Sequence, residues 1–488
     1  MAHNSFNRRG FFSLAAGGAG ASMMFSTTST GAQDKPGQLP FHRNLPLHRP
    51  YDLVVCGGGP SGIAAALAAR RSGLSVLLVE GQGQLGGTGI SGLVSHWLGG
   101  RTSDCERWAV GGVFQSLTLE AVERGIALIP VPDPEKKYQP HGWYKGQLAA
   151  GIPFDPFAMA AFLDRKMEQA GVDVLLLTQV VDVNVDGQKI SHVVLFNKSG
   201  LAAVPARAVV DATGDADVAA RSGCPVVKGD DEGLMTPTSL IFHVDNVDQD
   251  TLDSYIHEHD SPRFRQLILD LREAGQWTFP YEIFISAQLV EKGTMMINTI
   301  RLLGIDGADG ASKTEGMIRG REDTEQLLAV MRKHIPGFAS ARLKAIAPSL
   351  GVRETRRIVG RYVLTVDDLR KGAPFDDIVG YSAYGWDLPD PKRPSYNPSH
   401  GKRPEAAAIP YRIMIPAGME NLVCPGRAVS VERFVLGPLR VMAPCMAMGE
   451  AAGEAAVQVV RDKVPFGAVD TAGLRGQLRT NGAIVDWS

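Results

Sequence analysis

One stretch, residues 51–81, constrains the fold of this chain more than any other. It reads YDLVVCGGGPSGIAAALAARRSGLSVLLVEG: an apolar run, a cluster of glycines, an alanine-rich segment and a second apolar run. Short apolar runs are typical of buried parallel strands, and an alanine-rich segment of this length is typical of a helix packed closely on a sheet. The order strand, glycine turn, helix, strand predicts an α/β, Rossmann-like fold.

The spacing of the glycines predicts what the turn binds. Gly57, Gly59 and Gly62 satisfy the pattern G-x-G-x-x-G, in which the glycines allow a tight turn, a close approach to a pyrophosphate and close helix packing. The N–H groups at the start of the helix then face the phosphates. Glu80 ends the second strand, where a carboxylate can accept hydrogen bonds from a ribose and disfavours a 2′-phosphate. The predicted dinucleotide-binding residues here are Gly57, Gly59, Pro60, Ser61, Gly62 and Glu80.

Three later segments indicate that the dinucleotide is FAD. The sequence LGGTGISGLVS (85–95) resembles the segment that wraps the pyrophosphate and flavin in FAD enzymes of the glutathione-reductase-like type, and ATGDAD (212–217) resembles their second flavin-contacting turn. The third segment is NLVCPGRAVS (421–430), which precedes an alanine-rich helix whose N-terminus could stabilise negative charge on a reduced flavin. The further cofactor contacts predicted from this resemblance are Gly86, Gly87, Thr88, Val181, Gly214, Asp215, Gly426, Arg427 and Gly449.

Together with GVRETRRIVGRYVLTVDDL (351–369) and RVMAPCMAMGEAAG (440–453), these motifs make the chain from about residue 50 to residue 462 resemble a family of FAD-dependent oxidoreductases whose members are often labelled xanthan-lyase-like. The resemblance implies a glutathione-reductase-like FAD-binding domain with an inserted α+β substrate domain. Where relatives commonly carry a histidine after an "ID" pair, this chain reads YSAYGWDLPDP, with Trp386 and Asp387. The implied boundaries are 48–225 and 408–465 for the FAD-binding domain, 226–407 for the substrate domain, and 466–488 for a C-terminal segment.

The catalytic candidates are His96, Arg353 and Arg440. His96 follows the flavin-wrapping glycines and could take a proton from a carbon that bears a hydroxyl. His243, in a strand pattern, is a second candidate base. A structural role is the alternative for both histidines.

The arginine candidates lie in two segments. In RETRR, helical spacing would place Arg353 beside Arg356 or Arg357, where they could hold a carboxylate or stabilise a domain junction. Arg440 precedes the C-terminal helix and could favour an anionic reduced flavin or bind substrate.

The cysteines suggest packing rather than chemistry. The chain has five of them and no C-x-x-C pair, which argues against a metal site or a dithiol redox centre. Cys445 lies just after Arg440 and is interpreted as a small packing residue, although covalent flavin attachment at His96 or Cys445 stays open.

Composition excludes two classes of partner. The 488 residues carry a formal charge of −2 with no basic half, so a nucleic-acid partner is not expected. No apolar run reaches the length needed to cross a bilayer, so membrane insertion is not expected. A second glycine motif for a nicotinamide cofactor is not found, so the predicted electron acceptor is oxygen, a quinone or a small carrier protein.

The first 32 residues resemble a twin-arginine export signal. Arg8 and Arg9 precede Phe11, Phe12 and a weakly apolar stretch, and small residues at 30–32 suit a cleavage site. Twin-arginine systems carry folded, cofactor-loaded proteins, which predicts a periplasmic or secreted flavoprotein.

The sequence thus predicts an exported FAD-dependent dehydrogenase or oxidase that takes a hydride from a small polar substrate, for example a sugar or a hydroxy acid. A flavoenzyme that reduces or desaturates a C–C bond and a non-catalytic electron-transfer flavoprotein are the alternatives.

Overall fold

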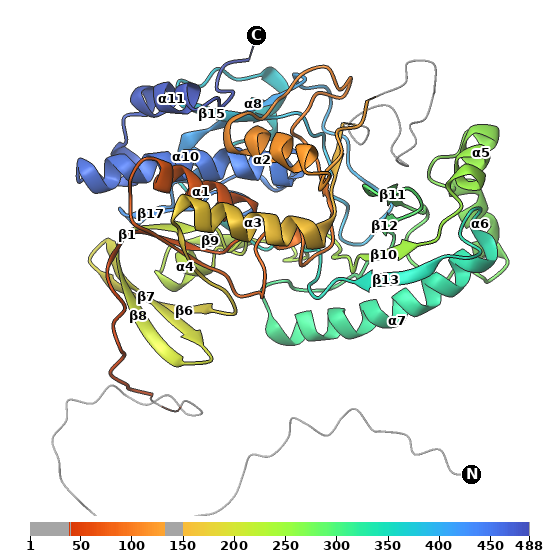
Figure 1. Cartoon of the computed structure of the whole chain (residues 1–488), viewed down its shortest axis with the longest axis horizontal. Helices are drawn as coiled ribbons and strands as arrows, with labels where there is room; N and C mark the ends of the chain where they lie inside the picture. Colours follow the sequence, from red (N-terminus) through yellow and green to blue (C-terminus); the bar gives the residue numbers. More distant parts are fainter. Residues whose placement is uncertain (1–38, 40, 132–149, 488) are drawn as a thin grey trace, which may run out of the picture. The chain divides into compact units, whose positions relative to one another are not determined.

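A seven-stranded sheet forms the centre of the fold (Figure 1). The computed structural model describes residues 39, 41–131 and 150–487; residues 45 onward form one unit, to which everything below refers. The strands run in the order β5-β2-β1-β8-β7-β6, with β17 also paired to β8. Their bounds are β1 (Tyr51–Cys56), β2 (Val76–Val79), β5 (Asp173–Leu175), β6 (Gln179–Asp186), β7 (Lys189–Asn197), β8 (Gly200–Asp211) and β17 (Leu422–Val423).

The longest strand, β8, joins two kinds of pairing. Its first half pairs with β7 in antiparallel orientation, and its second half pairs with β1 and β17 in parallel orientation. Strand β1 is buried on both faces: Leu53 and Val55 belong to one hydrophobic core, and Val54 and Cys56 to another. An unbroken apolar run is what a parallel strand covered on both faces requires.

Two helices from opposite ends of the sequence pack against each other above this sheet (Figure 1). Helix α1 (Pro60–Arg71) begins directly after the glycine turn, with Gly59 as its N-cap and proline at its first position. Helix α10 (Met442–Arg461) lies so close that a Cβ added at Gly449 or Gly453 would stand 2.0 or 2.3 Å from the carbonyl oxygens of Ser61 and Ala65. The C-terminal region therefore completes the layer that the first helix starts.

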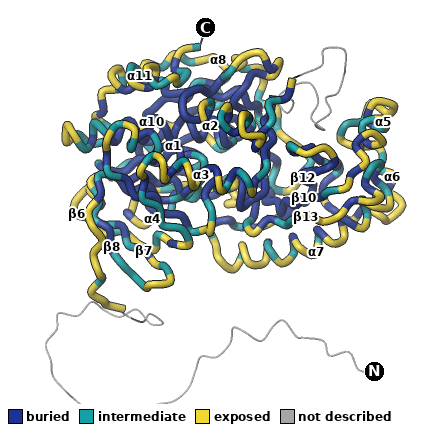
Figure 2. The backbone as a smooth tube through the Cα atoms, in the orientation of Figure 1, coloured by how far each residue is buried: buried dark blue, intermediate teal, exposed yellow. Residues whose placement is uncertain are grey.

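A smaller antiparallel sheet has its own hydrophobic core. Its strands, in spatial order, are β11 (Ser286–Gln288), β12 (Met295–Ile297), β10 (Phe242–Asp245) and β13 (Arg342–Ile346). Helix α7 (Gly310–His334) contributes Leu327 and Met331 to that core, while its outer surface stays exposed (Figure 2). Helices α5 (Gln249–His259) and α6 (Arg265–Glu273) complete this region.

The remaining elements are short or peripheral. The helices are α2 (Gly112–Glu123), α3 (Pro156–Ala170), α4 (Asp217–Arg221), α8 (Val366–Lys371), α9 (Leu436–Leu439) and α11 (Thr471–Thr480). The strand pairs are β3 (His96–Trp97) with β4 (Ile152–Pro153), β9 (Val226–Lys228) with β14 (Arg356–Ile358), and β15 (Ile378–Ser382) with β16 (Ala407–Pro410). Short 3₁₀ turns lie at Gly87–Gly89, Tyr411–Met414, Arg433–Val435 and Phe466–Ala468.

The predicted fold class is confirmed, and one local prediction is wrong. The Rossmann-like sheet and the additional antiparallel sheet are both present, whereas the exact domain boundaries stay a prediction. RETRR is not helical, because Arg356 and Arg357 start strand β14 and Arg353 lies in the preceding loop. The predicted export signal (1–32) lies outside the described residues, as does PDPEKKYQPHGWYKGQ (132–147), a segment that the sequence predicts to be a long loop. Across the part of the chain that the structure describes, no helix is long and apolar enough to cross a membrane.

Candidate functional site

A cavity of about 410 Å³ opens at the carboxyl ends of β1, β2 and β8. This edge is where open α/β sheets bind their ligands, and the volume lies within the usual range of small-molecule sites. The cavity brings together most of the residues that the sequence predicted. Those that line it are Gly57, Gly59, Pro60, Ser61, Glu80, Gly87, Thr88, His96, Gly214, Asp215, Arg353, Arg427 and Arg440.

The glycine turn leaves space for a phosphate. A Cβ at Gly57 would stand 2.4 Å from the Ala212 carbonyl oxygen, and one at Gly62 would stand 1.8 Å from the Gly57 oxygen, so these two glycines permit close packing. At Gly59, by contrast, a Cβ would meet no protein atom nearer than 4.0 Å. Gly59 also offers no side chain to cap the first N–H groups of α1, which is the arrangement that binds an anion at a helix N-terminus.

Glu80 is held in place beside this turn. Its Oε2 accepts a hydrogen bond from the Gly58 N–H at 2.7 Å, and its Oε1 accepts one from the Gln82 N–H at 2.7 Å. Burial raises the pKa of the Glu80 carboxyl, and the backbone N–H groups oppose that rise. The side chain lines the cavity with further lone pairs on both oxygens, which fits a ribose diol.

The predicted flavin-wrapping glycines close over the turn. The Gly86 N–H donates to the Gly58 carbonyl at 2.8 Å, and a Cβ at Gly87 would stand 2.9 Å from the Gly59 Cα. Gly86 has a φ of 103°, in the left-handed region that favours glycine. Thr88 follows on the cavity wall.

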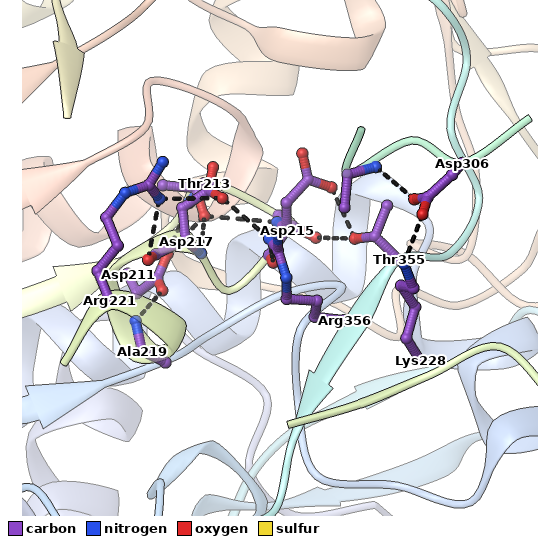
Figure 3. Close-up of polar contacts among 12 residues, drawn as sticks. Asp211, Thr213, Asp215, Asp217, Ala219, Arg221, Lys228, Asp306, Thr355 and Arg356 are labelled. Atoms are coloured by element: carbon purple, nitrogen blue, oxygen red, sulfur yellow. Dashed lines mark hydrogen bonds and ion pairs between the residues drawn. The ribbon is translucent and has the colours of Figure 1, made fainter. Parts of the chain in front are cut away.

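The turn after β8 is fixed by a polar network (Figure 3). Asp211 accepts hydrogen bonds from Thr213 Oγ1 at 2.6 Å and from the Ala219 N–H at 3.0 Å; burial raises the pKa of its carboxyl. Asp215 accepts hydrogen bonds from Thr355 Oγ1 at 2.7 Å and from Arg427 Nη2 at 2.6 Å. The network therefore ties the predicted cofactor residues Gly214, Asp215 and Arg427 to one another.

The same network accounts for one of the arginines in RETRR. Arg356 Nη1 donates to Asp217 Oδ1 and to the Asp215 carbonyl, both at 3.0 Å, and Lys228 forms an ion pair with Asp306 nearby (Figure 3). Arg356 thus joins strand β14 to the turn after β8, and the lining of the cavity does not include it.

Five predicted cofactor residues do not line the cavity: Gly62, Gly86, Val181, Gly426 and Gly449. Val181 is 37% exposed on β6, and its neighbour Val180 lines the cavity. A cofactor contact at Val181 stays a prediction. The four glycines act through packing: a Cβ at Gly426, for example, would stand 2.9 Å from Ser61 Oγ.

The cavity continues into a polar chamber that sequence reasoning largely missed. The Tyr384 hydroxyl donates to Asp387 Oδ2 at 3.0 Å, and Arg440 Nη2 donates to the Asp387 carbonyl at 2.8 Å and to its Oδ2 at 3.2 Å. Ser239 and Asn298 line the same cavity. Tyr384 and Asp387 lie in YSAYGWDLPDP (381–391), the segment that departs from the family pattern, and Ser239 and Asn298 lie in segments that carry no motif. Only the folded chain brings them to Arg440.

The two histidine candidates have different surroundings. His96 lines the cavity, is 1% exposed, and is packed so closely that a Cβ at Gly151 would stand 2.4 Å from its Cδ2. His243 Nε2 lies 3.0 Å from the Leu93 carbonyl oxygen, and burial lowers the pKa of His243 to about 4. His243 is therefore a neutral structural histidine, which is the alternative given for it from the sequence.

Cys445 lines the cavity, but its burial disfavours the reactive thiolate form. Burial raises the pKa of its thiol to about 12, and Sγ lies 3.4 Å from the Arg440 carbonyl oxygen. The thiolate, which is the nucleophilic form, is disfavoured near neutral pH. All five cysteines are free, and the described residues include no cluster of side chains suited to a metal ion.

The sheet, the glycine turn and the buried acid that ends β2 define a nucleotide-binding flavoprotein of the Rossmann-like class. Residues 52–478 match the family model described as FAD dependent oxidoreductase, and the chain belongs to that family. Its cofactor is FAD, and the open space at Gly59, the uncapped start of α1 and the anchored Glu80 fit that group.

Curated relatives are similar over part of the chain. A thiamine thiazole synthase from Aeropyrum pernix is 32% identical over 195 residues, which is 37% of this chain and 61% of that protein. A dihydrolipoyl dehydrogenase from Trypanosoma brucei brucei is 52% identical over 48 residues, 10% of each chain. Among solved structures, a geranylgeranyl bacteriochlorophyll reductase-like protein from Thermoplasma acidophilum is 14% identical with a TM-score of 0.44, covering 89% of this chain and 83% of that one.

Proposed function

We propose that this FAD-dependent oxidoreductase is an exported dehydrogenase or oxidase that converts a carbinol of a small polar substrate to a carbonyl. The observation that carries the proposal is the continuity of the cavity. Glycines and Glu80, which fit the nucleotide, share one lining with the polar side chains of Ser239, Asn298 and Tyr384. A polar compound held among those side chains would lie beside the cofactor.

The proposed reaction needs one group to accept a proton. Oxidation of a carbinol to a carbonyl breaks one C–H and one O–H bond and releases two electrons and two protons. FAD, when bound, supplies the two-electron acceptor. His96, on the wall of the cavity, is the proposed base for the hydroxyl proton, and Arg440 and Arg353 are proposed to hold the substrate. Oxygen, a quinone or a carrier protein would then reoxidise the cofactor.

Anaerobic reduction tests this function. The FAD-loaded protein is mixed with sugars, polyols and hydroxy acids without oxygen, and the visible flavin absorption is followed. Bleaching by a compound, with formation of its carbonyl product, supports the proposal. A flavin that dithionite bleaches but that none of these compounds bleaches would contradict it and favour the C–C redox or electron-transfer alternatives.

His96→Gln tests the base. We expect bleaching by the substrate to slow by roughly 10²- to 10⁴-fold, the usual contribution of a general base, with FAD still bound. His192→Gln, on strand β7 and absent from the cavity wall, is the matched control and should bleach at the wild-type rate. An unchanged rate in His96→Gln would remove His96 from the mechanism.

Export is a separate part of the proposal and rests on Arg8 and Arg9 with the apolar residues that follow them. Replacing both arginines by lysine in the full chain should leave the protein in the cytoplasm, where fractionation detects it. Unchanged export of that variant would contradict a twin-arginine route.

A further inference from the structure

Three arginines from separate segments meet at the polar chamber of the cavity. Arg353 Nη1 and Arg301 Nη1 both donate to the same oxygen, Ser239 Oγ, at 2.8 and 3.0 Å. Arg353 and Arg440 line the cavity, and Arg301 lies behind Ser239 with its guanidinium 4.2 Å from the centre of the Tyr281 ring. We call Arg301, Arg353 and Arg440 the arginine cluster.

The arginine cluster carries more positive charge than its surroundings neutralise. Arg353 Nη1 also donates to the Pro237 carbonyl at 2.8 Å, and the other hydrogen bonds of Arg301 go to Asn298 and to the Ile300 carbonyl, so these acceptors are all uncharged. Within residues 41–131 and 150–487, the carboxylate of Asp387 is the one that pairs with the cluster, through Arg440 at 3.2 Å. Three cations and one anion leave an excess charge of about +2 in a buried place.

The pKa shifts of Arg353 and Asp387 agree with an excess of positive charge in the arginine cluster. Burial and the nearby charges of Arg301 and Arg440 lower the pKa of Arg353 to about 9, whereas the arginines hold the pKa of the buried Asp387 carboxyl below its usual value. Asp387 is therefore ionised and already counted in the balance. Burying unpaired charge is costly, so a chain that keeps three arginines here gains from an anion that arrives with the ligand.

Two arginines of the cluster also have N–H donors that no acceptor in the described part of the chain satisfies. The Nε atoms of Arg301 and Arg440 are buried and have no hydrogen-bond acceptor among the protein atoms that the structure describes. Guanidinium groups present planar, paired donors that match the two oxygens of a carboxylate. Lys313, at the start of α7, is exposed and lines the same cavity, which adds a further positive charge along its wall.

We propose that the arginine cluster binds a carboxylate of the substrate, so that the substrate is a small organic acid, with one or two carboxylates, rather than a neutral sugar. The identification of the bound acid as the substrate rests on the proposed function, whereas the binding of an anion by the arginine cluster does not. The excess charge accommodates up to two negative charges, and Asp387 limits the attraction for more highly charged anions.

Equilibrium binding of an inert acid tests the inference without turnover. Malonate, which has no carbinol to oxidise, is titrated into the full-length, FAD-loaded protein, and the visible flavin spectrum and calorimetry are recorded. We expect saturable binding, weakened at least tenfold in Arg353→Met and in Arg440→Met, which corresponds to about 1.4 kcal/mol. Arg319→Met, on the exposed face of α7, is the matched control and should bind malonate as the wild type does.

A variant that should strengthen malonate binding separates a binding role of the arginine cluster from a structural one. Asp387→Asn removes the counter-charge, so malonate should bind several-fold more tightly, whereas a cluster that only stabilises the fold would show no such gain. This variant also covers the case in which Arg353→Met fails to fold. Weaker or unchanged malonate binding in a folded, FAD-loaded Asp387→Asn protein would overturn the inference.

The remaining outcomes distinguish the two proposals. Bleaching by neutral polyols but not by hydroxy acids would overturn the organic-acid inference and leave the oxidation proposal standing. Malonate binding without flavin bleaching by any carbinol would overturn the oxidation proposal and leave the anion-binding inference standing. Binding of inorganic phosphate or sulfate, with none of malonate, would overturn the choice of a carboxylate.

Discussion

At the scale of single residues, the site depends on groups whose partners are already fixed by the protein. Glu80 is anchored by two backbone N–H groups before any nucleotide arrives, and Asp215 is anchored by Thr355 and Arg427. Such preorganised acceptors do not have to be ordered at the moment of binding, which lowers the entropic cost of association.

Glu80→Ala should weaken FAD binding. The change removes the expected ribose acceptor and leaves the buried N–H of Gly58 without its partner, a loss of about 1–3 kcal/mol, or roughly 5- to 150-fold in Kd. Fluorescence titration of the apoprotein with FAD measures it. Glu168→Ala, at an exposed position of α3, is the matched control and should leave Kd unchanged. An equal Kd for Glu80→Ala would show that Glu80 does not contact the cofactor.

His243 should make the fold sensitive to acid. Its pKa is about 4 in the folded protein and 6.5 in the unfolded chain, because burial disfavours the charged ring. Between pH 6.5 and pH 4 the unfolded chain takes up a proton that the folded protein refuses, so stability is full above pH 6.5 and falls as the pH drops. The expected loss is about 3 kcal/mol across that window.

Denaturant unfolding at a series of pH values measures this effect as a difference between the wild type and His243→Gln, which can still donate to the Leu93 carbonyl. The difference in the free energy of unfolding should change between pH 6.5 and 4 and be level above pH 7. Parallel curves for the two proteins would show that His243 titrates normally in the folded state.

At the scale of elements, the packing of α1 against α10 determines how the cofactor turn is supported. A glycine inside a helix normally costs stability relative to alanine, yet α10 has two, Gly449 and Gly453, where its backbone comes closest to that of α1. The close approach holds the start of α1 in position beneath the cavity, so the two glycines of α10 serve the site without touching it.

Gly449→Ala and Gly476→Ala should change stability in opposite directions. The first places a Cβ 2.0 Å from the Ser61 carbonyl oxygen and should destabilise the protein by about 1–3 kcal/mol through overpacking, with loss of bound FAD. The second, inside α11, places a Cβ in open space and should stabilise the protein by up to about 1 kcal/mol. Thermal unfolding of both proteins is the measurement, and a stabilised Gly449→Ala would refute the packing argument.

Elements with local signatures were predictable from the sequence, and contacts between distant segments were not. The glycine turn, the acid at the end of β2 and the helix near residue 442 follow from spacing and apolar pattern alone. The helical spacing expected for RETRR is wrong because the pairing of β14 with β9, a contact between distant segments, decides its structure. Ser239, Asn298 and Arg301 meet Arg353 only because the small sheet brings residues 239–301 to the cavity, and such an arrangement leaves no pattern in one sequence.

At the scale of the whole molecule, the cavity is assembled from four parts of the chain. Its lining draws on residues 57–98, 178–217, 239–353 and 384–445. A ligand that touches all four stabilises the folded state as a whole, by about 2.7 kcal/mol at a free concentration one hundred times its Kd.

FAD should therefore raise the unfolding temperature of the apoprotein in a single transition, and FMN should do so much less because it lacks the AMP half that Glu80 is expected to bind. Differential scanning calorimetry with each flavin at the same concentration makes the comparison. Equal protection by FMN would contradict the role of Glu80, and two transitions of which FAD shifts one would contradict the shared lining.

The separation of the cavity residues along the chain has a consequence for folding during synthesis. Residues 57–98 leave the ribosome first, and Arg427, Arg440 and Cys445, which line the same cavity, follow more than 300 residues later. Until then a nascent chain carries the nucleotide turn without α10, against which α1 packs. Flavin incorporation is therefore expected only after residue 445 has been made, and a chain truncated before residue 421 should bind no flavin and should leave α1 incompletely packed.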